Sequence, residues 1–249
     1  MAETLAALRR QRTLVLGLNL VYFLALLALG VTVFLRSRAG ALGVAAALAV
    51  YLLLVRPMTE RYRRAIRAAI LEYGVCDGMT DVTYAPREGF AASEFLSSGL
   101  INTVSDKAFL SREKVTARRG DMALTMADVT FPIREGGRNA MSSGLYIRLQ
   151  KPGAVFPALT LSAGDTEGLS LSGKAAALVR EMASFVPGNL YLHADGETLH
   201  VFFRGRFVGF TINPLMNLSE RILRANPLPE AEQALRLALM LAAGQERNG

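Results

Sequence analysis

Apolar and polar positions divide the chain into two unlike parts, with the change near residue 56. From Thr13 to Leu35 the chain carries no charged residue, and Asn19 is one of its few polar positions. A helix over these residues is roughly 34 Å long at a rise of about 1.5 Å per residue. That length crosses the hydrocarbon layer of a bilayer, which is about 30 Å thick. The pattern therefore predicts a membrane-spanning helix over about 13–35.

A second uncharged run, Ala39 to Val55, follows the short polar turn Arg36-Ser37-Arg38. As a helix it is roughly 25 Å long, which suits little tilt or a locally thinned bilayer. The two runs predict a membrane-embedded hairpin of helices 13–35 and 39–55, within an anchor over residues 1–56. A cleaved signal peptide fits less well, because its apolar core usually has only ~7–15 residues.

Small residues recur at four-residue intervals in the second run, at Ala39, Gly43 and Ala47. Such spacing lets helix backbones approach closely, against the first helix or against a second copy of the chain. Asn19 would then seek a hydrogen-bond partner across that contact. Ala and Gly are also tolerated in membrane helices without any such role, and the sequence leaves both interpretations open.

Arginines flank the hairpin on both sides. They are Arg9, Arg10 and Arg12 before it, and Arg56, Arg61, Arg63, Arg64 and Arg67 after it. Basic residues tend to stay on the cytoplasmic side, where they contact anionic lipid headgroups. We therefore predict a multi-pass protein of the cytoplasmic (inner) membrane, with both termini and the following domain cytoplasmic. The two arginines of the turn weigh against that orientation.

The formal charge of +7 is explained by these membrane-surface arginines. We expect no nucleic-acid partner, because no interleaved aromatic residues of the kind that stack on bases accompany the arginines. The expected partners are the lipid bilayer with its anionic headgroups, and a protein partner or a second copy of the chain.

A juxtamembrane helix is predicted over residues 57–75. Pro57 either interrupts the preceding helix or opens a new one at its first turn. Beyond it, Tyr62, Ile66 and Tyr73 belong to an apolar stripe opposed by arginines, which is typical of a basic amphipathic helix. This helix would lie on the headgroups or pair with another copy, and Gly74 ends it.

Residues 76–249 show short strand-like runs and helices in place of long apolar stretches, which predicts an α+β domain of mainly antiparallel strands with C-terminal helices. The lone Cys76 excludes an internal disulfide and a cysteine-based zinc site. Predicted strands lie within 109–134, with a reversal at Gly120-Asp121, and at 145–150, 155–161, 190–203 and 206–212. Predicted helices lie at 91–100, 173–185, 215–224 and 230–243.

Several short motifs follow the apolar hairpin in a fixed order. They are Ser98-Gly99-Leu100, Arg112-Glu113-Lys114-Val115, Ala127-Asp128-Val129, Ser143-Gly144-Leu145-Tyr146-Ile147 and Leu190-Tyr191-Leu192, with Phe202 on a later strand. Together they resemble a bacterial family of hairpin-anchored membrane proteins that carry a β-rich domain of unknown function. Members often have an acidic residue and then a glycine four positions on, where this chain has Glu113 and Ala117. The resemblance implies a membrane location and a cytoplasmic β-rich domain, but no activity and no catalytic residues.

The segment from Gly168 to Lys174 has the G-x-x-x-x-G-K spacing of a phosphate-binding loop, with Gly168, Gly173 and Lys174 as its candidate residues. In such loops the Lys points at the phosphates and the next Ser or Thr binds Mg²⁺. Here Ala175 stands at that position, and no parallel βαβ pattern surrounds the loop. An ordinary loop that leads into a helix explains the segment better.

His193 and His200 lie on opposite arms of a predicted hairpin around residues 195–197. An even-length loop places both on one face, directly opposed or diagonal, at roughly 5–8 Å. Two imidazoles suit zinc, but no third and fourth ligand is evident, and the opposite face is the one expected to be buried. We therefore expect partly exposed histidines without a metal, or a pH-sensitive pair.

No coherent set of acid, base, nucleophile or metal ligands emerges from these motifs. We therefore hypothesise a non-enzymatic two-pass membrane protein without a cofactor, whose cytoplasmic domain is a partner-binding or self-assembly module. One alternative is a membrane-tethered nucleotide-dependent regulator or enzyme that uses Lys174. Another is an anionic-lipid-binding domain docked by Arg61, Arg63, Arg64 and Arg67.

Overall fold

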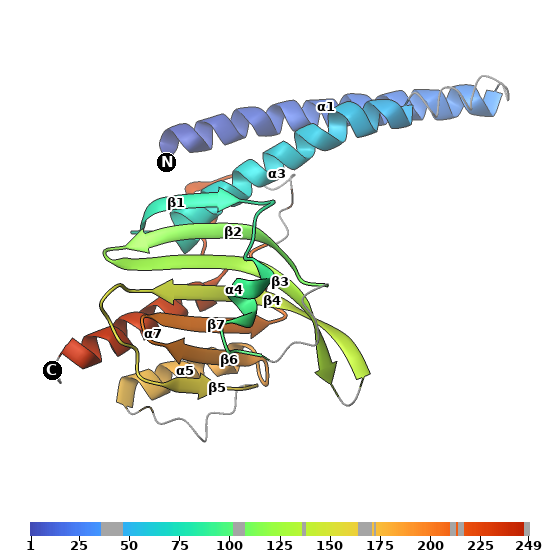
Figure 1. The fold of residues 1–249 in the computed structure, drawn as a ribbon. Helices are drawn as coiled ribbons and strands as arrows, with labels where there is room; N and C mark the ends of the chain where they lie inside the picture. The colour runs from blue at the N-terminus through green and yellow to red at the C-terminus, as the bar shows by residue number, and fades with distance from the viewer. Residues whose placement is uncertain are drawn as a thin grey trace. The chain divides into compact units, whose positions relative to one another are not determined.

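The computed structural model describes residues 1–35, 47–101, 108–135, 138–163, 171, 173–209, 213 and 217–246. Over these residues the chain forms two compact units (Figure 1). One unit comprises Met1–Gly74 and Thr211–Ala225, and the other comprises Val75–Phe210 and Asn226–Gly249. The chain thus returns to its N-terminal unit late in the sequence.

The N-terminal unit is built on two long helical stretches. The first is α1 (Ala2–Leu35), and the second runs without a break from residue 47 through the π-helical segment η1 (Tyr51–Val55), α3 (Arg56–Ile70) and the π-helical segment η2 (Leu71–Val75). The predicted first span lies within α1. Of the predicted second span, 39–55, residues 39–46 lie outside the described residues, so a second membrane-spanning helix is not shown.

The two stretches pack against each other in antiparallel fashion (Figure 1). The Thr4 and Tyr73 hydroxyls lie 3.1 Å apart at one end of the contact. The rings of Tyr22 and Tyr51 lie 5.3 Å apart toward the other end. Apolar residues at three- and four-residue spacing are buried along this seam; they include Leu5, Leu8 and Val15 of α1, and Val55, Tyr62, Ile66 and Ala69 of the second stretch.

Pro57 does not break the second stretch, which differs from one of the two predicted alternatives. Proline has no N–H to donate to a carbonyl four residues earlier. The structure accommodates it at the start of α3, and the preceding residues 51–55 widen into a π-helix. Such wider turns are a common way for a helix to absorb a local disruption of its hydrogen-bond ladder.

The late segment of the N-terminal unit contains a single described turn of helix, α6 (Glu220–Leu223). The predicted helix over 215–224 is wrong in its extent, since residues 217–219 are not helical. The Ser219 hydroxyl caps α6 by accepting from the N–H of Ile222. Arg9 of α1 donates to the carbonyl oxygen of Leu218 at 3.1 Å, which ties this segment to the first helix.

In the second unit, the described residues form one antiparallel sheet of seven strands in the order β1-β2-β3-β4-β7-β6-β5 (Figure 1). The strands are β1 (Thr80–Ala85), β2 (Leu110–Arg119), β3 (Met122–Glu135), β4 (Arg138–Gln150), β5 (Leu159–Leu161), β6 (Leu190–Asp195) and β7 (Thr198–Arg204). The predicted α+β class with grouped antiparallel strands is confirmed.

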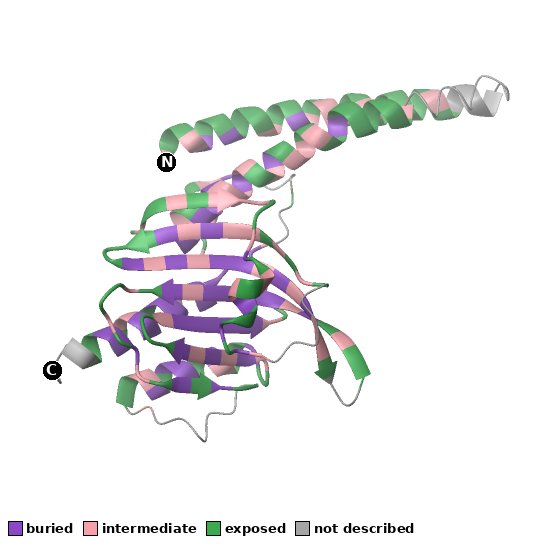
Figure 2. Cartoon of the chain, in the orientation of Figure 1, coloured by how far each residue is buried: buried purple, intermediate pink, exposed green. Residues whose placement is uncertain are grey.

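Helices cover the sheet on both faces. In Figure 1, α5 (Gly173–Phe185) and α7 (Pro229–Glu246) lie on one face, and the short α4 (Ala92–Leu96) lies on the other. Buried and less buried residues alternate along β6 and much of β2, as expected of a pleated sheet, whereas the central strand β7 is buried on both faces (Figure 2). The face under α4 carries an aromatic cluster of Phe90, Phe95, Phe131, Tyr146 and Phe202, joined by Leu100, Ala127 and Val129.

The chain after β7 forms a loop, although the sequence predicts a strand over 206–212. Residues Arg206–Gly209 are not in a strand, and residues 210–212 lie outside the described residues. The carboxylate of Asp128 on β3 accepts the N–H groups of Val208 and Gly209, the latter at 3.1 Å. These N–H groups therefore bind a side chain and are unavailable for strand pairing.

Candidate functional site

Both helical stretches expose large apolar side chains in the part of the hairpin farthest from Met1. Leu53 is 73% exposed and Val21 is 65% exposed. The apolar band, as we call it, consists of Leu14, Leu20, Val21, Phe23, Leu24, Leu26 and Leu27 of α1, and Leu48, Val50, Tyr51, Leu52, Leu53 and Leu54 of the second stretch. In Figure 2 this part of α1 is mostly exposed, in contrast to the buried central strand β7.

Among the described residues, α1 is the one helix long and apolar enough to cross a membrane, over Ala2–Gly30. Only 6% of its most apolar window is buried inside the structure. A core helix of a globular protein would bury most of that window, because exposed apolar surface is costly in water. The length, composition and exposure of α1 are therefore all consistent with a helix that crosses a membrane.

The arginines predicted to flank the hairpin lie at the same end of it, because the two stretches run antiparallel. Arg12 is close enough to Tyr62 to act on it electrostatically: burial raises the pKa of Tyr62, and the charge of Arg12 opposes that shift. Arg61 lines a pocket on one side of the seam, while Arg56 and Arg63 line a larger pocket. Of the other predicted membrane-surface arginines, Arg64 is exposed and Arg67 is half-buried.

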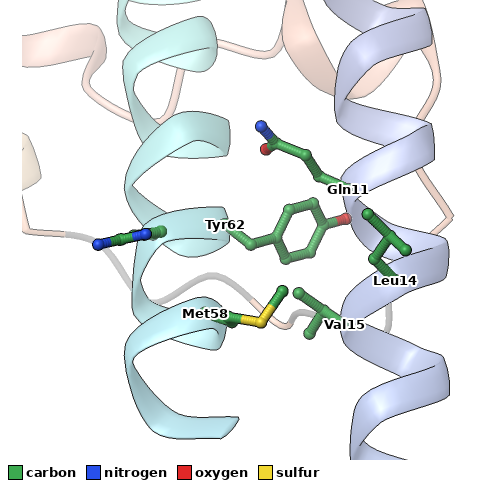
Figure 3. Close-up of a pocket in the computed structure, with 6 residues that line it drawn as sticks. Gln11, Leu14, Val15, Met58 and Tyr62 are labelled. Carbon is green, nitrogen blue, oxygen red and sulfur yellow. The ribbon is translucent and has the colours of Figure 1, made fainter. Parts of the chain in front are cut away.

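The smaller pocket has a volume of about 140 Å³ and lies between α1 and α3 (Figure 3). In Figure 3 the ring of Tyr62 points from α3 toward Gln11 and Leu14 of α1, and Met58 faces Val15. The Tyr62 hydroxyl is buried and has no hydrogen-bond partner among the described residues. The pocket is thus mainly apolar, with Gln11 and Arg61 as its polar members.

The larger pocket has a volume of about 300 Å³ and is more polar. It is lined by Val15, Leu16 and Asn19 of α1, and by Tyr51, Arg56, Thr59, Glu60 and Arg63 of the second stretch. Glu60 and Arg63 form an ion pair of 2.9 Å. The Thr59 hydroxyl donates to the carbonyl oxygen of Val55 at 2.9 Å. Two arginines and one carboxylate give this pocket a net positive charge.

The residues predicted for helix packing are only partly described. Ala39 and Gly43 lie outside the described residues, and Ala47 is half-buried in the second stretch. The side-chain amide of Asn19 donates to the carbonyl oxygen of Val15 at 2.7 Å, within its own helix. Asn19 also lines the larger pocket. Close packing through Ala39, Gly43 and Ala47 stays a prediction.

On the sheet face that carries α4, one polar row crosses all seven described strands. Strand pairing places its members side by side, in the order Thr83, Thr116, Thr125, Arg148, His200, His193 and Thr160. Paired residues of antiparallel strands project to the same face. The hydroxyls of Thr83 and Thr116 lie 2.6 Å apart, and the Thr160 hydroxyl lies 3.1 Å from Nδ1 of His193. The predicted pairing of the two histidines on one face is thereby confirmed as a directly opposed pair.

His200 is buried, which corrects the expectation that both histidines are partly exposed. Its Nδ1 lies 2.7 Å from the hydroxyl of Tyr146 in a buried hydrogen bond, and the two rings are stacked. Burial lowers the pKa of His200 to about 4, with the nearby His193 and Arg148 acting in the same direction. Burial also raises the pKa of Tyr146. Both side chains are therefore neutral at neutral pH.

Arg148, the neighbour of His200 in the row, forms an ion pair of 3.0 Å with Glu94 of α4. Its guanidinium also lies over the ring of Phe90, 5.3 Å from the ring centre. The pKa of Glu94 is lowered, first by the backbone N–H of Ala91, at 2.9 Å, and then by Arg148. Arg148 thus connects α4 to the sheet next to His200.

Sequence reasoning missed Tyr146, Arg148 and Glu94 as neighbours of the histidines. β4 and β7 are far apart in the sequence and meet only through strand pairing, and no local motif announces that contact. Among the described residues no group of three or more His, Cys, Asp or Glu is placed so that it could hold a metal ion.

The predicted phosphate-loop residues are described only in part. Gly168 lies outside the described residues. Gly173 begins α5 with a positive φ of 62°, and Lys174 is exposed on the first turn of that helix. These positions do not test nucleotide binding, which the sequence offers only as an alternative to an ordinary loop that leads into a helix.

No protein-family model, curated protein or solved structure matches the chain. The resemblance to hairpin-anchored bacterial membrane proteins therefore stays a prediction.

Proposed function

We propose that this chain is a two-pass membrane protein whose α+β domain works at the membrane surface as a partner-binding or self-assembly module. In this proposal the hairpin sits in the bilayer, and the domain follows it on the side of the arginines. The protein performs no catalysis of its own. The observation that carries the proposal is the apolar band, which surrounds both helical stretches of the hairpin.

The energetics of the apolar band favour lipid over water. Burying a large aliphatic or aromatic side chain is worth about 1.5–3 kcal/mol, and members such as Leu53 and Val21 are more than half exposed. The backbone of the band is helical, so its N–H and C=O groups are already satisfied within the helices, as a bilayer requires. In the described hairpin, charged residues occur only before Thr13 and after Val55, at the end that carries the arginines.

The eight arginines that flank the hairpin support one orientation, against the two arginines of its turn. Because α1 and the second stretch are antiparallel, Arg9–Arg12 and Arg56–Arg67 lie at one end of the hairpin, on the side where both chain ends leave it. The positive-inside rule places that end in the cytoplasm. We therefore propose the cytoplasmic (inner) membrane, with both termini and the α+β domain cytoplasmic.

A labelling experiment tests this two-pass topology. Single cysteines are introduced as Ala6→Cys and Ser37→Cys in a Cys76→Ala background, and intact cells are treated with a membrane-impermeant maleimide. We expect position 37 to react in intact cells and position 6 only after permeabilisation. Reaction of both positions in intact cells, or of position 6 alone, would overturn the topology.

The β3–β4 hairpin supports a binding role for the domain. The pairing of β3 with β2 ends at Thr130, and the pairing of β4 with β7 begins at Gly144. The residues beyond these points form a two-stranded arm that extends past the rest of the sheet (Figure 1). Its outer edges have no strand partner among the described residues, and Met141 on it is 55% exposed. Unpaired strand edges are templates for a further strand.

Site-specific photo-crosslinking in native membranes tests the arm. A photoreactive phenylalanine analogue is placed at Met141 or, as a matched control, at the exposed Asp121 in the turn at the opposite end of β3. We expect a discrete crosslinked species from position 141 and none from position 121. Equal crosslinking at both positions, or none at position 141, would remove the arm as the binding element.

A further inference from the structure

We propose that the larger pocket of the hairpin binds the headgroup phosphate of an anionic phospholipid, with Arg56 and Arg63 as its cationic ligands. This inference rests on the proposed insertion of the hairpin into a bilayer. It assigns a specific lipid site to a basic segment that the sequence alone describes only as a membrane-surface flank.

The position of the pocket along the hairpin fits a lipid headgroup. The Tyr22–Tyr51 contact lies on the side of the apolar band, and Arg12 lies near Tyr62 on the other side. The pocket lies between these two levels, since its walls run from Tyr51 to Arg63. In an inserted hairpin this is the boundary between hydrocarbon and headgroups. A phosphate at this level would have its acyl chains alongside the apolar band.

The charges of the pocket favour an anion. Arg56 and Arg63 are two helical turns apart on α3, roughly 10 Å along the axis, and Thr59 and Glu60 lie between them in the sequence. Glu60 neutralises one guanidinium by pairing with Arg63 at 2.9 Å. Arg56 has no acidic partner among the described residues. The pocket therefore retains one positive charge, which an anionic phosphate complements better than a zwitterionic headgroup does.

The apolar walls distinguish a lipid from a free phosphate ion. Val15 and Leu16 of α1 form one side of the pocket, and Tyr51 forms its end toward the apolar band. An inorganic phosphate gains nothing from these side chains, whereas a phospholipid buries its glycerol and first methylene groups against them. Tyrosine is also enriched at this depth, where its ring contacts hydrocarbon and its hydroxyl contacts water.

The smaller pocket supplies an internal control. It lies on the same seam and at a similar level, but Arg61 is its one arginine, beside Met58 and Leu14. Its volume, about 140 Å³, is half that of the larger pocket. The exposed Arg64 lines neither pocket, so Arg61→Gln/Arg64→Gln removes two charges from the same helix, as the test variant does, without changing a residue of the proposed site.

The test uses the full-length chain in nanodiscs of equal parts phosphatidylglycerol and phosphatidylcholine, followed by release into mild detergent and native mass spectrometry. We expect the wild-type chain and Arg61→Gln/Arg64→Gln to retain one phosphatidylglycerol. We expect the double variant Arg56→Gln/Arg63→Gln to retain at least roughly tenfold less phosphatidylglycerol, because each basic side chain contributes to the binding of anionic lipid. Millimolar inorganic phosphate should not displace the lipid from the wild-type chain.

Three outcomes overturn the inference. The first is equal phosphatidylglycerol retention in Arg56→Gln/Arg63→Gln and Arg61→Gln/Arg64→Gln. The second is retention of phosphatidylcholine by the wild-type chain to the same extent as phosphatidylglycerol. The third is full displacement of the lipid by phosphate, which would indicate a plain anion site. Each leaves the membrane insertion of the hairpin intact. A wild-type chain that fails to enter the nanodisc would instead refute the proposed function.

Discussion

The rings of Tyr22 in α1 and Tyr51 in η1 lie 5.3 Å apart. Both residues belong to the uncharged runs of the sequence, and they meet across the seam of the hairpin at the level of the apolar band. Together with the Thr4–Tyr73 hydroxyl contact of 3.1 Å, this pair fixes the register of the two helical stretches. The register in turn aligns the exposed apolar side chains of both stretches into one band.

This register predicts efficient crosslinking between positions 22 and 51. In a Cys76→Ala background, Tyr22→Cys/Tyr51→Cys should form an intramolecular crosslink with a short bismaleimide in membranes, because the two side chains face each other. Tyr22→Cys/Leu53→Cys serves as the matched control, since Leu53 is 73% exposed and points away from the seam. Gel mobility after proteolysis between the helices measures the yield. Equal yields for both pairs would contradict the register.

Replacement of Gly74 should destabilise the N-terminal unit. A Cβ at this position would lie 2.3 Å from the carbonyl oxygen of Ala225, so the backbone must shift to admit Gly74→Ala. We expect a loss of about 1–3 kcal/mol, the usual cost of overpacking. Gly244→Ala is the control, because a Cβ there meets nothing within 4 Å. Thermal unfolding in detergent measures both, and an unchanged midpoint for Gly74→Ala would contradict the close approach of residues 74 and 225.

His200 should make the stability of the α+β domain depend on pH. Its pKa is lowered to about 4 in the fold from an ordinary value of 6.5, chiefly by burial. The unfolded chain therefore binds a proton that the folded chain does not, so the contribution of His200 is fully present above pH 6.5 and is lost as the pH falls toward 4. The whole contribution of His200 to the free energy of unfolding is on the order of 3 kcal/mol.

Urea unfolding followed by circular dichroism at pH 7 and pH 4.5 measures this contribution. His200→Gln should lose less stability than the wild-type chain between these two pH values, because the group that takes up the proton is gone. His193→Gln should keep most of the wild-type pH dependence, since Tyr146 and its neighbours still bury His200. Identical pH dependence in the wild-type chain and His200→Gln would show that the imidazole is not buried as described.

Local patterns predicted the elements that local chemistry determines. The reversal at Gly120-Asp121 correctly separates β2 from β3, and the helix over 173–185 has the bounds of α5. β1 was missed, because Thr80, Asp81 and Thr83 interrupt any apolar alternation. β1 exists through its pairing with β2, where Thr83 lies opposite Thr116.

Contacts between distant residues explain the remaining differences. The apolar residues after Arg206 look like a strand in sequence, but the Asp128 carboxylate on β3 binds the N–H groups of Val208 and Gly209. The histidine pair was predictable because one hairpin carries both members. The contact of this histidine pair with Tyr146 and Arg148 was not predictable, since it depends on which strand lies beside β7. The return of residues 211–225 to the N-terminal unit likewise leaves no mark in the local pattern.

Alkaline carbonate extraction of membranes that contain the full-length chain tests the central claim most directly, because it strips proteins held at the surface and leaves those that span the bilayer. If the hairpin is inserted, the chain stays in the membrane pellet after extraction, like an integral protein probed in parallel. Recovery of the chain in the carbonate supernatant would contradict insertion and, with it, the lipid site at Arg56 and Arg63.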